Sequence, residues 1–98
     1  MTIQIQTFDS VWDAIGDTVE QAENMKIRAQ LMRVLTDFIV RKELSQAEAA
    51  RTLGITQPRV SELVHGKIHL FSIDKLISMM ATAGIHIANI EVTEGVVA

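Results

Sequence analysis

Residues 45–67 read SQAEAARTLGITQPRVSELVHGK, and the first half of this stretch has the start and stop signals of a short helix. Ser45 is a suitable N-cap residue, and Glu48, three positions later, completes a capping box. Gly54 ends the helix, because glycine enters the left-handed backbone conformation without a steric cost. The stretch therefore predicts a helix of about two turns followed by a tight turn.

The second half of the stretch predicts another short helix. Thr56 can cap it, and Pro58 falls in its first turn, where the missing N–H of proline does no harm. Gly66 stops it. Apolar residues recur at spacings of three and four and are expected to face inward. They are Val60, Leu63 and Val64.

Two short helices joined by a glycine turn, with a small residue where they cross, describe a helix-turn-helix unit. Ala50 is the predicted crossing residue, because a larger side chain there would push the helices apart. The stretch resembles the DNA-binding helix-turn-helix of the phage-repressor (Xre/Cro) family. The residues that carry the resemblance, at the family's spacing, are Gln46, Ala50, Gly54, Gln57 and Val60.

The resemblance implies that the second helix lies in the major groove of DNA, with its N-terminal end at the base edges. The candidate base-reading residues are Gln57, Pro58, Arg59, Ser61 and Glu62. The candidate phosphate contacts are Gln46, Thr56, His65 and Lys67. Gln57 can bond adenine bidentately, and Arg59 can bond guanine. Glu62 can accept from cytosine, but an ion pair with Arg59, three residues earlier, is equally expected.

Charge is unevenly distributed along the chain of 98 residues, whose net charge is −3. Nine Lys and Arg and five Asp and Glu lie between residues 26 and 75, so this window carries +4. Residues 1–25 carry −5 and residues 76–98 carry −2. A basic middle that coincides with the motif favours a DNA-binding surface, whereas the charges alone fit a mixed solvated surface equally well.

Outside the motif, the apolar pattern predicts two further helices and two short strands. One helix opens at Thr18 and runs to about residue 42, with Asn24 as a candidate break, and Ser72 caps the other. Alternating apolar residues predict strands over residues 3–8 and 85–92. The expected inward faces are Ile27, Leu31, Val34, Leu35, Phe38 and Ile39 in the first helix, and Ile73, Leu76, Ile77, Met80 and Ala83 in the second.

A lone strand leaves its backbone groups unpaired and is not stable. The strand over residues 85–92 is therefore expected to build a homodimer, by pairing with its symmetry mate or with strand 3–8 across the two-fold axis. The alternative is that the two strands pair within one chain, which leaves a monomer or a helix-packed dimer. A two-fold dimer places its two recognition helices ~34 Å apart, over an inverted-repeat operator.

The predicted fold is a single, mainly α domain over residues 1–98, a repressor-like domain of four to five helices with short terminal β-strands. The order of its elements is similar to that of the small HigA-type antitoxin branch of the repressor family. That resemblance implies a homodimeric repressor of its own operon that neutralises a protein toxin, a ribosome-dependent RNase. The alternative function is a protein-interaction module that mainly binds and neutralises the toxin.

Enzymatic and metal chemistry have little support in the sequence. His65 and His69 are four residues apart, but Gly66 interrupts the helix between them, and the chain has no cysteine to complete a site. No glycine-rich phosphate loop occurs. We therefore expect no enzyme activity, no metal and no cofactor. The lack of cysteine, of a secretory signal and of an apolar run long enough for a bilayer predicts a cytoplasmic protein without membrane contact.

Overall fold

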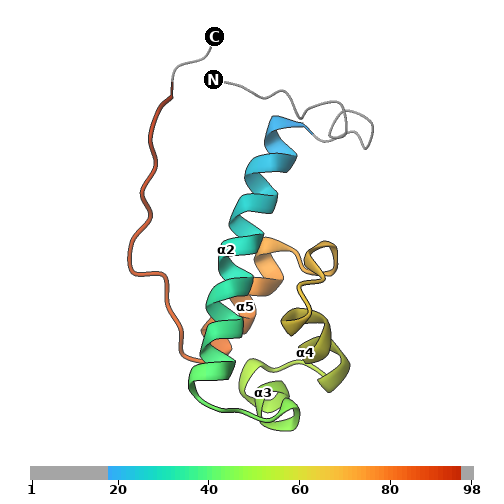
Figure 1. Cartoon of the computed structure of the whole chain (residues 1–98). Helices are drawn as coiled ribbons and strands as arrows, with labels where there is room; N and C mark the ends of the chain where they lie inside the picture. Colours follow the sequence, from blue (N-terminus) through green and yellow to red (C-terminus); the bar gives the residue numbers. More distant parts are fainter. Residues whose placement is uncertain (1–17, 96–98) are drawn as a thin grey trace.

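Four α-helices and one short 3-10 helix form within residues 18–95, the part of the chain that the computed structural model describes. In chain order they are α2 (Val19–Arg41), α3 (Gln46–Leu53), α4 (Gln57–Val64), η2 (Ile68–Leu70) and α5 (Ile73–Thr82). Figure 1 shows α2 as the long axis of the molecule, with α5 against it and with α3 and α4 together on one side. The predicted strand over residues 3–8 lies outside the described residues.

Each α-helix begins at a hydroxyl side chain that caps it. The hydroxyl oxygens of Thr18, Ser45 and Ser72 each accept a backbone N–H three residues later at 3.1 Å, and that of Thr56 does so at 3.4 Å. Thr18 and Ser45 also form complete capping boxes. The helix starts predicted from the sequence are therefore confirmed.

The same four helices end in a left-handed residue, in the geometry of the Schellman motif. The residue after it donates its backbone N–H to the carbonyl five positions earlier, at 2.8–3.0 Å. The left-handed residues are Glu43 (φ 54°), Gly54 (φ 72°), Gly66 (φ 73°) and Gly84 (φ 81°). Three of the four are glycine, so the strain of this conformation falls on Glu43 alone.

We expect that Glu43→Gly raises the free energy of unfolding by ~0.5–1 kcal/mol. The left-handed conformation costs a side-chain-bearing residue ~1–2 kcal/mol, and the extra chain entropy of glycine offsets part of the gain. Urea denaturation measures the difference. Glu43→Ala is the matched control, because it removes the carboxylate and keeps the strain. Equal unfolding energies for the two variants would contradict the expectation.

The core lies where α2, α3, α4 and α5 meet, and its side chains are almost entirely aliphatic. Ala49 and Ala50 are 0% and 8% exposed, which lets α3 and α4 approach closely. Contacts between α3 and α4 confirm the helix-turn-helix unit predicted from residues 45–67. The buried residues are Met32, Leu35, Ile39, Ala49, Ala50, Leu53, Val60, Leu63, Phe71, Leu76, Met79 and Met80.

Several residues predicted to be buried are exposed. Val64 is 38% exposed and Ile77 is 41% exposed. On α2, Ile27 and Val34 are 37% and 42% exposed, while Met32, which the pattern did not select, is buried. The apolar spacing predicted the helix correctly. It assigned to one buried face the residues of two neighbouring stripes, of which only the one with Met32, Leu35 and Ile39 is buried.

The candidate break at Asn24 does not occur, since α2 runs without interruption from Val19 to Arg41. The Asn24 side-chain oxygen accepts a hydrogen bond from Arg28 Nε at 2.6 Å, one turn along the same helix. This contact satisfies the amide without competition for the helix backbone.

The predicted strand over residues 85–92 is wrong. Within residues 18–95 the last helix ends at Thr82, and the segment beyond Gly84 has no regular secondary structure and joins no sheet. Among these residues, the Ile85 N–H to Met80 carbonyl bond is the last between backbone groups. A strand needs a partner edge, and the described part of the fold offers none. The mainly helical part of the prediction describes the fold correctly.

Candidate nucleic-acid interface

Helix α4 turns one face to the core and leaves the other to solvent. Val60 and Leu63 are each 1% exposed and anchor the helix against the rest of the domain. Gln57, Pro58 and Arg59 in the first turn are exposed. The exposed face continues through the predicted base-reading residues Ser61 and Glu62, which are half-buried. These five residues share the accessible side of one short helix, as a groove-reading helix requires.

Arg59 is held by three contacts within the protein. Its Nη1 donates to Glu62 Oε1 at 2.9 Å and to the Leu70 carbonyl at 3.4 Å. The guanidinium carbon lies 5.6 Å from the centre of the Phe71 ring, a cation–π distance. The ion pair that the sequence offered as an alternative to base reading by Glu62 is therefore present. Arg59 leans toward η2, and its side chain is still 45% exposed.

Phe71 is a part of this arrangement that the sequence did not reveal. It is 1% exposed and packs in the core, yet its ring also supports the Arg59 guanidinium. In sequence it stands only as a link between helices, twelve residues after Arg59. The signal in the sequence was a large aromatic residue directly before the Ser72 cap. This signal does not indicate that the residue contacts Arg59.

The far end of α4 carries two predicted phosphate contacts, His65 and Lys67, both exposed. His65 Nδ1 lies 2.7 Å from the Ser61 carbonyl oxygen, so this nitrogen donates and the ring is fixed against the last turn. Nε2 can then donate to a phosphate only in the imidazolium form. The Lys67 backbone N–H donates to the Glu62 carbonyl, which places this residue just beyond the helix end.

The other two predicted phosphate contacts, Gln46 and Thr56, lie at helix starts. Gln46 is the first residue of α3 and is exposed. The Glu48 carboxylate already accepts the Ser45 backbone N–H at 2.8 Å, and this hydrogen bond lowers the pKa of Glu48. The Thr56 hydroxyl caps α4 through the Arg59 N–H. Both helix starts are therefore partly satisfied by the protein itself.

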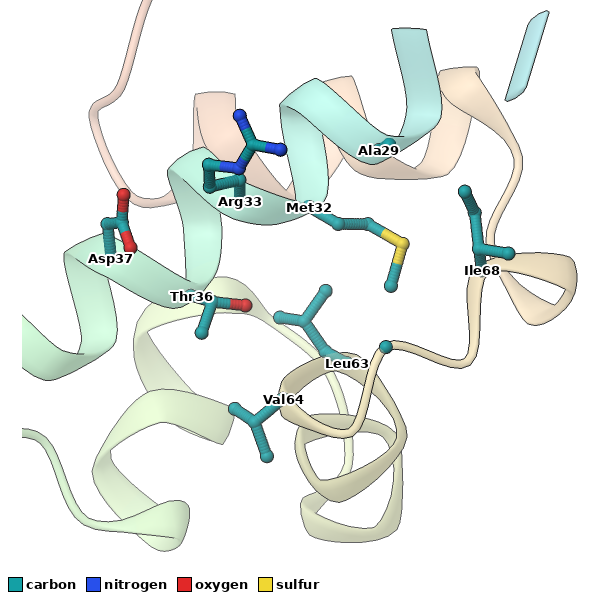
Figure 2. Close-up of a pocket in the computed structure, with 9 residues that line it drawn as sticks. Ala29, Met32, Arg33, Thr36, Asp37, Leu63, Val64 and Ile68 are labelled. Atoms are coloured by element: carbon teal, nitrogen blue, oxygen red, sulfur yellow. The ribbon is translucent and has the colours of Figure 1, made fainter. Parts of the chain in front are cut away.

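A shallow open hollow of about 290 Å³ separates α4 from α2 (Figure 2). Figure 2 shows Met32 and Leu63 directed into it from the two helices, with Val64 beside Leu63 and Ile68 opposite. Val64 lines this hollow, which explains why it is exposed although its position in the helix pattern is apolar. None of the five predicted base-reading residues of α4 lines this hollow.

No group of three His, Asp or Glu side chains suited to a metal ion occurs among the residues that the structure describes. His65 and His69 lie on either side of Gly66, in α4's cap and in η2. Within the same residues, no helix is long and apolar enough to cross a bilayer.

Comparison with known proteins agrees with this geometry. A family model described as a helix-turn-helix domain matches residues 14–93. A solved structure assigned to the XRE family of transcriptional regulators matches with a TM-score of 0.65 and 31% sequence identity, over 79% of this chain and 97% of that one. The chain belongs to the XRE helix-turn-helix family. No curated protein matches its sequence. The XRE resemblance predicted from residues 45–67 is confirmed, and the HigA-type branch stays a prediction.

In this XRE-family domain, we expect Glu62→Gln to strengthen binding to every duplex about two- to fivefold, since it removes a negative charge from the predicted DNA-facing side of α4. Glutamine keeps the shape and can still accept from Arg59. Fluorescence anisotropy with an operator duplex and a scrambled duplex measures both affinities. Glu91→Gln is the matched control, because it removes the same charge from the exposed C-terminal segment. A loss of affinity confined to one base pair of the operator would instead assign base reading to Glu62.

Proposed function

We propose that the protein is a dimeric, sequence-specific repressor that binds an inverted-repeat operator through α4. The observation that carries the proposal is the exposed face of α4 in a domain of the XRE helix-turn-helix family. Family membership supports the coarser statement, a DNA-binding regulator of transcription. The residues proposed to read bases are Gln57, Pro58, Arg59 and Ser61, with Glu62 either reading cytosine or serving only as the ion-pair partner of Arg59. Those proposed to hold phosphates are Gln46, Thr56, His65 and Lys67.

Electrostatics support DNA as the partner in spite of the net charge of −3. The +4 window between residues 26 and 75 contains all of α3, α4 and η2. Interaction with a polyanion depends on the local surface more than on the summed charge, because solvent ions screen charges beyond about 10 Å. The remaining acidic residues lie in residues 1–25 and 76–98, so they are distant from α4 in sequence.

The experiment is quantitative footprinting of the protein on the DNA upstream of its own gene. The proposal expects two protected half-sites related by two-fold symmetry, with centres one helical turn apart, ~34 Å. It also expects affinity to fall steeply as salt rises, because lysine and arginine contacts displace counterions. Equal affinity for this DNA and for random duplex would contradict sequence-specific repression.

We further propose that this regulator is an antitoxin of the HigA type, which represses its own operon and neutralises a protein toxin. The order of the elements around residues 45–67 supports this role, as does the acidic lead over residues 1–25, which complements a basic partner. Co-expression with the product of the adjacent gene, followed by a growth assay, tests it. A partner that is neutralised while no DNA is bound would favour the alternative, a module that acts mainly through protein interaction.

A further inference from the structure

A second apolar stripe runs along α2 beside the one that enters the core. Ile27 and Val34 are 37% and 42% exposed, and Leu31 and Phe38 are half-buried. Their spacings of four, three and four place all four on one side of the helix. Within residues 18–95 the fold covers Met32, Leu35 and Ile39 and packs Leu31 against them, but it leaves Ile27 and Val34 exposed, although both are large and apolar.

The stripe faces away from the recognition helix. Ala29, Arg33 and Thr36 line the hollow between α2 and α4, so they mark the side of α2 nearest to α4. By the 100° step of an α-helix, Ile27 and Val34 lie on the opposite side from these residues. Figure 1 shows α3 and α4 together on one side of α2 and the C-terminal segment on the other side. A partner on the stripe would therefore leave α4 free for DNA.

Opposite charges stand at the two ends of the stripe. Glu23 lies at the N-terminal end, where it pairs with Lys26 at 3.1 Å in an exposed contact. Arg41 and Lys42 lie at the C-terminal end, with their charged groups 5.7 Å and 5.9 Å from the centre of the Phe38 ring. An acidic start, an apolar middle and a basic end form a surface that is complementary to its own reversed copy.

The order of these residues is symmetric about a point between Met32 and Arg33. Reversal about this point exchanges Ile27 with Phe38 and Leu31 with Val34. It also exchanges Glu23 with Lys42. A two-fold axis at that point would thus place apolar side chains opposite apolar ones and an acid opposite a base, twice over. Isologous contacts in two-fold dimers have this self-complementarity.

We propose that α2 packs antiparallel against α2 of a second copy through Ile27, Leu31, Val34 and Phe38, with Glu23 of each copy beside Lys42 of the other. This interface deepens the proposed function, because it supplies the dimer on which that function rests. Neighbouring helices pack 8–10 Å apart. The α4–α2 distance on each side and the α2–α2 distance between them then add up to about 24–30 Å between recognition helices, the same order as the ~34 Å between successive major grooves.

The test compares two identical substitutions on one helix. Val34→Glu puts a carboxylate in the middle of the stripe, while Val40→Glu, at a site 69% exposed and off the stripe, is the matched control. Sedimentation equilibrium measures dimerisation, and circular dichroism confirms the helices. We expect Val34→Glu to weaken dimerisation at least about tenfold, with the control dimerising as the wild type does. Equal dimerisation of the two variants would overturn the interface.

Charge reversal supplies a second, independent measurement. Glu23→Lys alone or Lys42→Glu alone should weaken the dimer, and the double variant Glu23→Lys, Lys42→Glu should restore it, because each reversed charge again meets its opposite. Failure of the double variant to restore dimerisation would overturn the proposed pairing.

Operator binding separates this inference from the function it rests on. If the interface is right, Val34→Glu keeps weak binding to a single half-site and loses the tighter binding to the full inverted repeat. If the wild type and Val34→Glu both dimerise and both repress, only the proposed interface is overturned. A wild type that is monomeric on its operator overturns both the interface and the dimeric repressor, and leaves DNA binding by the single domain intact.

Discussion

Gln57→Ala should weaken operator binding by ~1–3 kcal/mol, about 5- to 150-fold, and relax the preference at one base pair. Gln57 is the first residue of α4 and is exposed, and within residues 18–95 its side chain makes no hydrogen bond. Its truncation should therefore remove the proposed contacts to DNA without disturbing the domain. Fluorescence anisotropy with the operator and with all single-base variants of one half-site measures both effects.

Lys67→Ala is the control, because Lys67 lies just beyond the end of α4 and is proposed to contact a phosphate and not a base edge. Its loss should weaken binding to all sequences alike and lower the salt dependence by about one phosphate contact. Arg59→Ala should resemble Gln57→Ala in specificity, with a small loss of stability from the Phe71 and Glu62 contacts. Unchanged base preference in both Gln57→Ala and Arg59→Ala would contradict the assignment of α4 to the groove.

Leu35→Ala should lower the free energy of unfolding by ~2–5 kcal/mol. Leu35 is 0% exposed in the middle of α2, so the truncation leaves a cavity in the core that α2 forms with α4 and α5. Small domains have only about 5–15 kcal/mol of net stability, which makes this loss a large share of the total. Urea denaturation followed by circular dichroism measures it.

Val40→Ala on the same helix is the matched control. Val40 is 69% exposed, and its truncation should change the unfolding energy by no more than about 0.5 kcal/mol. A Leu35→Ala variant as stable as Val40→Ala would mean that Leu35 is not enclosed by the core.

The elements that the sequence predicted correctly depend on interactions within a few residues. Ser45 and Thr56 cap helices through N–H groups three positions ahead, and Gly54 satisfies a turn that closes over five residues. These interactions can be predicted from a short stretch of sequence, because the stretch contains both the donor and the acceptor of each hydrogen bond. The motif over residues 45–67 was therefore located, and Ala50, its predicted crossing residue, is buried.

The errors concern contacts between distant parts of the chain. Val64 has an apolar helical spacing, but a hollow rather than a helix lies beside it. The alternating residues over 85–92 suggested a strand, but alternation does not supply a partner edge. In the candidate site, the contact of Arg59 with Phe71 depends on how η2 returns to α4. The choice of base-reading residues among the exposed residues of α4 also stays a prediction, because their partner, the DNA, is not part of the chain.

The Schellman ends of the helices have a consequence for how quickly the protein forms. Each connection that follows such an end and leads to another helix has only three or four residues, and most contacts in the fold join residues that are close in sequence. Helical domains with such low contact order fold in microseconds to milliseconds, far faster than two dilute chains meet. For the dimeric repressor proposed above, association of two chains rather than folding of each chain would then limit how soon the operator is occupied, and that association becomes faster as the concentration of the protein rises.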